Sequence, residues 1–214
     1  MAARPKYSTK EKMQETRLRI LEAAEEAFAA RGIDGANMRE IAQAAGVNKF
    51  MLYYYFENKE SLFVQVLQSN LQPAFQQLQA ILSQPLSLEE AIREVYELYA
   101  SLFKRKGGRL RAFMAREVAI GGGHIKDSLA DLVPHIMELW EPKIVSYLGV
   151  DSLPDRQLRQ LVGSIMLGTV AYFLLEPLFG EIMLAAGISL EDEDMIQHAV
   201  YFALGGVRAQ LSEQ

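Results

Sequence analysis

The stretch VNKFMLYYYFENKE, residues 47–60, concentrates hydrogen-bond donors and apolar rings in a chain of net charge −5. Its lysine ammonium groups and tyrosine hydroxyls can donate to phosphate oxygens, and a lysine can also donate to guanine. Its phenylalanine and methionine side chains can press on the methyl group of thymine. These residue types suit contact with a nucleic acid, through Asn48, Lys49, Phe50, Met51, Tyr53, Tyr54 and Lys59.

The rest of the chain offers little for catalysis or metal binding. It has no cysteine, and its three histidines, His124, His135 and His198, show no metal-ligand spacing. No grouping of serine, histidine and an acid suggests an activated nucleophile. We therefore expect no metal, no cofactor and no enzyme activity. The alternative is a helical enzyme or small-molecule carrier in which residues 1–60 merely pack.

Helices must position the side chains of the 47–60 stretch. Apolar residues at three- and four-residue spacing predict a first helix that ends near Gly32. Asn37 and Asn48 are suitable N-caps for the next two helices, and Gly46 stands in the turn between them. Two short helices joined by a turn that contains glycine form a helix-turn-helix.

This helix-turn-helix is expected to bury one side and expose the other. Ala42 is small enough for a close helix crossing, and Gly46 supplies a positive backbone angle in the turn. The spacing predicts burial of Ile41, Val47, Leu52 and Phe56 between the helices. The polar and aromatic side chains between Asn48 and Tyr54 are left outward, and an exposed row of large apolar groups needs a partner surface.

Charge is unevenly distributed along the chain. Basic side chains outnumber acidic ones by six to two in residues 1–20, whereas residues 61–214 carry 12 basic and 18 acidic side chains. A basic arm ahead of the helix-turn-helix suits attraction to phosphates, and a solubilising tail is the alternative. The absence of cysteine and the charged N-terminus MAARPKYSTK favour a cytoplasmic location.

The segment TRLRILEAAEEAFAARGIDGANMREIAQAAGVNKFMLYYYFENKESLF, residues 16–63, closely resembles the DNA-binding domain of the tetracycline-repressor (TetR) family of bacterial transcription regulators. The first helix, REIAQAAGV, LYYYF and the next lysine occur in the family's order and spacing. The resemblance implies that Tyr53 and Lys59 bind phosphates and that residues 48–51 and 54 face the bases of double-stranded DNA. Asn37 stands where the family often has threonine, which keeps the cap and a phosphate donor. Phe50 stands where small residues are common.

The chain as a whole is expected to be all-α. Residues 1–62 are predicted to form an N-terminal three-helix helix-turn-helix DNA-binding domain with a basic N-terminal arm. Residues 63–214 are predicted to form a C-terminal helical ligand-binding and dimerisation domain. Periodicity in this second part predicts helices near 59–82, 87–105, 108–120, 126–148, 154–179 and 190–211.

The run LVGSIMLGTVAYFLL, residues 161–175, is apolar on all sides. It is bracketed by Arg159 and Glu176 and is shorter than the roughly 20 residues that span a bilayer, so we expect no membrane segment. The family resemblance implies a homodimer through two helices of each subunit. The residues predicted at this contact are Leu167 and the small residues Gly163, Ser164, Gly168, Ala171, Ala199, Ala203 and Gly206. An intramolecular core is the alternative. A two-fold dimer would read an inverted repeat.

A small-molecule effector is expected in the second domain. Proline residues interrupt or kink its helices and leave gaps that a ligand can fill, at Pro73, Pro134, Pro142 and Pro177. The predicted ligand-binding residues are Phe113, Met114, Glu117, Trp140 and Tyr172. Core packing is the alternative for each of them. The expected function is a ligand-responsive repressor that releases DNA on binding a mostly apolar or aromatic molecule. Repression is the commoner mode in the family that this chain resembles, and no residue here excludes activation.

Overall fold

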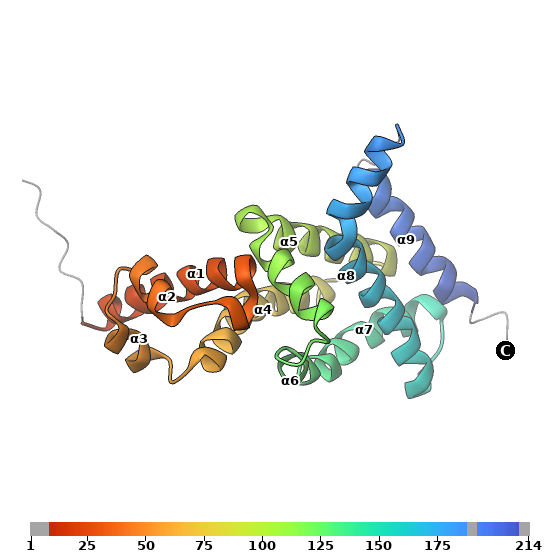
Figure 1. Ribbon diagram of the computed structural model, residues 1–214. Coiled ribbons are helices and arrows are strands. Elements are labelled where there is room, and N and C mark those ends of the chain that lie inside the picture. The colour runs from red at the N-terminus through yellow and green to blue at the C-terminus, as the bar shows by residue number, and fades with distance from the viewer. Residues whose placement is uncertain (1–8, 188–191, 210–214) are drawn as a thin grey trace, which may run out of the picture. The chain divides into compact units, whose positions relative to one another are not determined.

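The computed structural model describes residues 9–187 and 192–209, and those residues form helices joined by turns (Figure 1). The helices are α1 (Thr9–Gly35), α2 (Met38–Ala44), α3 (Lys49–Tyr55), α4 (Lys59–Leu82), α5 (Leu88–Ala119), α6 (Lys126–Ala130), α7 (Val133–Leu148), α8 (Asp155–Ala185) and α9 (Asp192–Ala209). No strand occurs among the described residues. The all-α prediction is confirmed.

The helix predicted over residues 126–148 is divided into α6 and α7. Pro134 lies in the first turn of α7, where the N–H that proline lacks would have no partner in the helix. A new helix therefore begins there. Conversely, the two helices predicted over residues 87–105 and 108–120 form a single helix in the structure, α5. Gly107 and Gly108 nevertheless have φ values of 66° and 76°, so regular helical geometry is interrupted between the two predicted segments.

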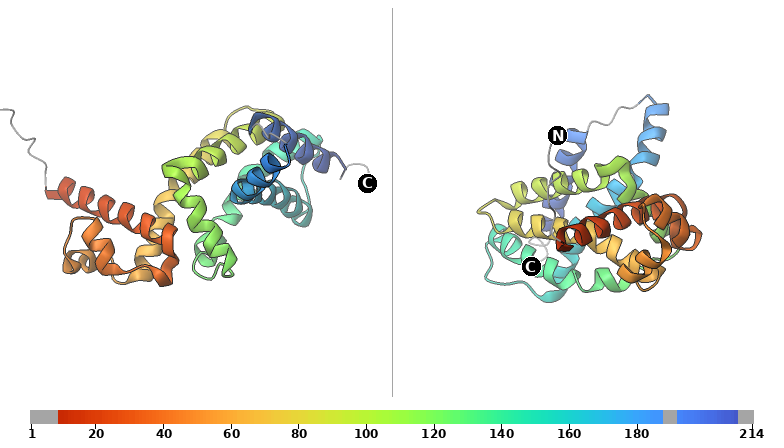
Figure 2. Two further views of the ribbon diagram at one scale, coloured as in Figure 1. Left: turned by 45° about the horizontal axis from the view of Figure 1, so that its top comes forward. Right: turned by 90° about the vertical axis from the view of Figure 1, so that its left-hand side faces the viewer.

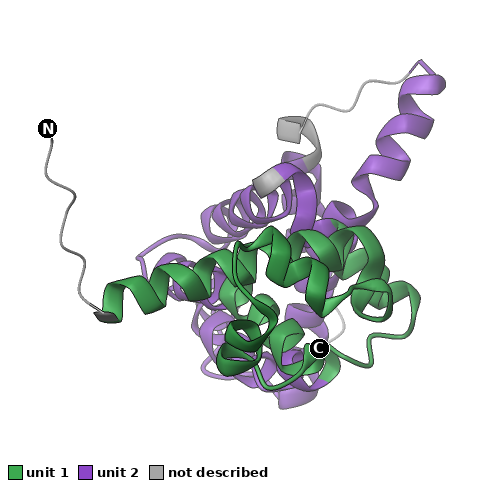
Figure 3. Cartoon of the chain, turned by 60° about the vertical axis from the view of Figure 1, so that its left-hand side comes forward, with its two compact units in different colours: residues 1–71, 112–126 green, residues 72–111, 127–214 purple. Residues whose placement is uncertain are grey.

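The chain divides into two compact units that do not follow a single cut near residue 62 (Figure 3). Unit 1 comprises residues 1–71 and 112–126, and unit 2 comprises residues 72–111 and 127–214. The helix-turn-helix thus shares its unit with the end of α5 and the turn after it. The boundaries between the two units fall within helices: after residue 71 in α4, after residue 111 in α5 and after residue 126 in α6.

Three phenylalanine rings form the centre of unit 1. Phe28 of α1 meets Phe63 of α4 edge-on at 5.3 Å between ring centroids, and Phe113 of α5 stacks on Phe63 at 4.6 Å. All three side chains are buried. Burial of one such ring contributes about 1.5–3 kcal/mol. This cluster explains why residues 112–126 belong to the same unit as the helix-turn-helix.

Helix α1 is interrupted where the sequence predicts its end. Gly32 has φ 71° and ψ 178°, and one further helical turn continues to Gly35. These angles are not those of the left-handed cap expected at this position. They are accessible essentially only to glycine. A Cβ atom on residue 32 would also lie 2.8 Å from Cδ of Arg116, so the arginine side chain would have to move to admit it.

Unit 2 is a helical domain whose last three helices pack on each other (Figures 1 and 2). Trp140 and Ile144 of α7 are fully buried, as is Val200 of α9. Helix α8 turns one face into the core, through Leu158, Leu161, Val162, Ile165, Thr169 and Phe173. The ring of Phe173 packs against Tyr96 and Phe103 of α5, with centroid distances of 6.3 and 6.2 Å.

Candidate nucleic-acid interface

Helix α3 is fixed at both ends and buried along one side. The side-chain oxygen Oδ1 of Asn48 accepts a hydrogen bond of 2.7 Å from the backbone N–H of Met51, as the predicted N-cap requires. Leu52 and Phe56 are 0% and 2% exposed. The predicted burial of Ile41, Leu52 and Phe56 is confirmed, whereas Val47 is only half-buried. The helix therefore presents a defined outer face.

That outer face carries the predicted aromatic side chains. Phe50 is 89% exposed and Tyr54 is 72% exposed, while Tyr53 and Met51 are exposed to about half that extent. The ammonium group of Lys49 lies 5.6 Å from the ring centroid of Tyr53, one turn along the helix. This cation–π contact holds a positive charge over the exposed face. The face thus combines a cation, two phenols and two apolar side chains.

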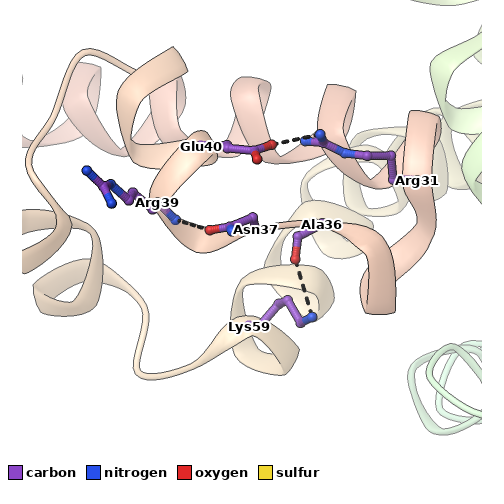
Figure 4. A network of polar contacts seen from close by, with 6 residues as sticks. All are labelled: Arg31, Ala36, Asn37, Arg39, Glu40 and Lys59. Atoms are coloured by element: carbon purple, nitrogen blue, oxygen red, sulfur yellow. Dashed lines mark hydrogen bonds and ion pairs between the residues drawn. The ribbon is translucent and has the colours of Figure 1, made fainter.

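Helix α2 is capped as predicted. Oδ1 of Asn37 accepts a hydrogen bond of 2.8 Å from the backbone N–H of Arg39 (Figure 4). Gly46, in the turn to α3, has the expected positive φ, 66°. Because each cap uses only the amide oxygen, the NH₂ groups of Asn37 and Asn48 stay available as donors at the exposed ends of the two helices.

Lys59 lies at the start of α4, but its ammonium group turns back to the end of α1. Nζ donates to the carbonyl oxygen of Ala36 at 3.3 Å (Figure 4) and to that of Asp34, also at 3.3 Å. An ammonium group has three N–H donors. Two of them serve these carbonyls, and the third is left for the phosphate that the sequence predicts. Lys59 therefore also fixes the loop between α1 and α2.

Two arginines lie near the helix-turn-helix although the sequence analysis does not single them out as DNA contacts. The guanidinium of Arg17 in α1 lies 5.8 Å from the ring centroid of Phe56 and donates to the side chain of Gln65. Arg39 is exposed in the first turn of α2. A cation at that position opposes the helix dipole, which favours acids there. That conflict is the signal by which Arg39 stands out as a candidate phosphate donor.

The five predicted ligand-binding residues do not lie in one unit. Phe113, Met114 and Glu117 are buried in unit 1, where Phe113 stacks on Phe63. Trp140 and Tyr172 lie in unit 2. The indole Nε1 of Trp140 is buried and has no hydrogen-bond partner among the described residues.

The predicted dimer residues lie mainly on exposed parts of α8 and α9. Leu167 is 71% exposed, and Gly163, Ser164, Gly168 and Gly206 are exposed as well. The alanines of this set are half-buried, at Ala171, Ala199 and Ala203. Beyond the predicted set, the second half of α8 exposes Leu175, Leu178, Phe179, Ile182 and Leu184.

Helix α8 is long and apolar enough to cross a membrane by length and composition alone. Only 28% of the most apolar 18-residue stretch of this helix is buried within the described part of the protein. Glu176 near the middle of this helix forms an ion pair of 3.1 Å with Arg111. Such a pair is costly in hydrocarbon and ordinary at a protein surface. Much of the apolar surface of α8 is therefore uncovered by the part of the chain that the structure describes.

Comparison with known proteins places the helix-turn-helix in one family. Residues 20–66 match the model described as "Bacterial regulatory proteins, tetR family". The HTH-type transcriptional regulator TtgR of Pseudomonas putida is 46% identical over 61 residues, which are 28% of this chain and 29% of TtgR. The alignment thus spans less than a third of that relative. The HTH-type transcriptional regulator RutR of Escherichia coli is 26% identical over 181 residues, or 85% of this chain and 83% of RutR.

A solved structure shows the same fold over most of the chain. The transcriptional regulator FadR from Bacillus subtilis, in complex with stearoyl-CoA, has a TM-score of 0.68 at 15% identity and covers 88% of this chain and 98% of FadR. The family match includes helix α3, whose exposed face is described above, and the similarity to RutR extends over 85% of the chain. The helix-turn-helix of this chain is therefore of the type found in the TetR family of bacterial transcriptional regulators.

Proposed function

We propose that the chain is a sequence-specific DNA-binding transcriptional regulator, acting as a ligand-responsive repressor in the cytoplasm. The observation that carries this proposal is the outer face of α3, where Phe50 and Tyr54 are 89% and 72% exposed on a helix anchored by Leu52. Large aromatic side chains exposed together on one helix face usually mark a surface that binds a partner. The alternative, a carrier or enzyme that does not bind DNA, leaves this face unexplained.

The chemistry of the α3 face fits the major groove. Lys49 can donate to the N7 and O6 acceptors of guanine, and Phe50 and Met51 can contact thymine methyl groups. Tyr53 and Lys59, with the amide group of Asn37, would donate to phosphates along the flanking strand, and the amide group of Asn48 would face the bases. The bases would be read by the middle of the helix, and the phosphates would fix its register.

A second copy of the chain is the partner that fits α8. Opposite its core face, exposed or half-exposed positions recur at alternating steps of four and three residues, at Ser164, Gly168, Ala171, Leu175, Leu178 and Ile182. This 3.5-residue period is that of a helix–helix seam. On α9, His198, Phe202 and Gly205 repeat the same steps. Two-fold pairing of these seams would cover both faces and set two α3 helices on an inverted repeat.

The core of unit 2 offers polar groups to an effector. Nε1 of Trp140 has no partner among the described residues, and the hydroxyl of Tyr99 meets the sulfur of Met166, a weak acceptor, at 3.9 Å. Burial raises the pKa of Tyr99 to about 12, so this hydroxyl stays a donor at neutral pH. An unpaired buried donor costs about 1–3 kcal/mol. An apolar molecule with a hydrogen-bond acceptor would relieve that cost, and the structural neighbour that binds stearoyl-CoA is consistent with this class.

Tyr53→Phe tests the phosphate contact. Removing the hydroxyl deletes one hydrogen bond to a charged group, so operator affinity is expected to fall by about 10- to 100-fold. Fluorescence anisotropy with labelled operator measures this, and Tyr55→Phe, on the half-buried side of α3, is the matched control. Equal affinity of Tyr53→Phe and the unaltered protein would refute the assigned role.

Leu175→Glu tests the dimer. The substitution buries a charge at the centre of the proposed seam, so the protein is expected to become monomeric at micromolar concentration. Leu184→Glu is the control, because nine residues further along a helix is the opposite side, and Leu184 is exposed there as well. Sedimentation equilibrium reads the mass. A Leu175→Glu protein that stays dimeric would exclude this seam.

Trp140 reports on the effector directly, because it is the chain's only tryptophan. Stearoyl-CoA, stearic acid and a flat aromatic ketone serve as probes of the apolar class. At least one is expected to change the emission of Trp140 and to weaken operator binding by about 5- to 100-fold, the usual range of allosteric coupling. Emission and operator affinity that respond to none of the three would count against an apolar effector beside Trp140.

A further inference from the structure

The DNA-binding unit is discontinuous in sequence, and its second piece supplies a contact to the helix-turn-helix. Residues 112–126 belong to unit 1 together with residues 1–71 (Figure 3). Within that piece, Nη2 of Arg116 donates a hydrogen bond of 3.0 Å to the backbone oxygen of Ala30. The stem of Arg116 lies against Gly32, where a Cβ atom would approach Cδ to 2.8 Å. Arg116 thus packs on the interruption in α1.

The segment that carries Arg116 is held firmly. Phe113, three residues earlier, stacks on Phe63. Glu117, the next residue, is 1% exposed, and its Oε2 lies 3.0 Å from Nδ1 of His124. The backbone oxygen of Glu117 accepts from the N–H of Gly122 at 2.8 Å. These contacts fix the position of Arg116 without any help from DNA.

The end of α1 is the junction that orients the helix-turn-helix. Arg31 forms an ion pair of 2.7 Å with Glu40 of α2, and Lys59 of α4 donates to Ala36 (Figure 4). Lys59 also donates to the backbone oxygen of Asp34. Arg116 adds a third tie, from α5. The backbone then continues directly into the cap of α2, which packs on α3. A shift of the junction would therefore move the reading helix.

We propose that Arg116 is a positioning residue for DNA recognition. It holds the α1–α2 junction through Ala30 and Gly32, and so sets the orientation of α3, without contacting DNA itself. Its effect on operator affinity rests on the proposed function. Its effect on the junction does not, because that follows from contacts within unit 1.

The first test compares Arg116→Gln and Arg116→Lys in the full-length chain, with Arg105→Gln as a control. Arg105 is exposed on the same helix within unit 2, so its substitution removes the same charge without the junction contact. Loss of one hydrogen bond is expected to weaken operator binding roughly three- to tenfold in Arg116→Gln. Arg116→Lys restores part of the affinity, and Arg105→Gln leaves it unchanged. The melting temperature is expected to fall by only a few degrees in Arg116→Gln, so all three variants stay folded in the binding assay.

Salt dependence separates positioning from direct contact. The slope of log Kd against log salt is expected to be unchanged in Arg116→Gln, whereas loss of a phosphate contact lowers it by about one. A lowered slope would make Arg116 a DNA ligand and overturn the proposal. Unchanged affinity, or an equal loss in Arg105→Gln, would overturn it as well.

Hydrogen exchange provides a readout that needs no DNA. The amide of Ile41 donates to the backbone oxygen of Asn37, and the amide of Ala45 donates to that of Ile41. Both amides are expected to exchange faster in Arg116→Gln, while amides of α8 are unaffected. Unaltered exchange at Ile41 and Ala45 would refute the role of Arg116 at the junction. If the unaltered protein binds no DNA, the proposed function fails, and the exchange measurement still decides whether Arg116 positions α2.

Discussion

The buried contact among Phe28, Phe63 and Phe113 is the constraint on which the DNA-binding unit depends. It joins three helices that are far apart in sequence, α1, α4 and α5, around rings 4.6 to 6.4 Å apart. The helices α2 and α3 are seven residues each, too short to be stable alone. They depend on the platform that these rings assemble. Arg116 and Lys59 then fix the end of α1 and the loop that connects it to α2.

Helix α3 combines two tasks that pull in opposite directions. In the proposed function its outer face needs large exposed side chains to reach base edges, and such side chains reduce solubility and favour aggregation. Its inner face compensates, because Leu52 and Phe56 are almost completely buried and the Asn48 cap closes the first turn. A short helix with an apolar outside is therefore held in one orientation. That rigidity is what sequence-specific reading requires.

Local signals made much of the fold predictable from sequence. The caps at Asn37 and Asn48 act over two or three residues, and the burial pattern of Ile41, Leu52 and Phe56 follows helical spacing. Such local signals could not predict that residues 112–126 join residues 1–71 in unit 1. Phe113 and Phe63 are fifty positions apart, and nothing in the periodicity of α5 distinguishes a ring that meets Phe63 from one that lines a ligand site.

The same limit applies to α8. Its small residues suggest a close helix contact, and the sequence analysis names them. Leu178 and Leu184 lie after the apolar run of residues 161–175 on which the sequence analysis concentrates. Their exposure in the structure shows that the uncovered apolar surface of α8 continues beyond that run. Which apolar side chains face the core is a property of tertiary packing, because a helix apolar all round has no polar face to mark the outside.

The central claim is that the α3 face reads a defined DNA sequence. Selection of bound fragments from a random double-stranded pool, with the full-length chain at near-physiological salt, tests it most directly. The account predicts enrichment of an inverted repeat whose half-sites lie about one helical turn, roughly 10 base pairs, apart or a multiple of it. A pool that shows no enriched sequence after repeated rounds would contradict it.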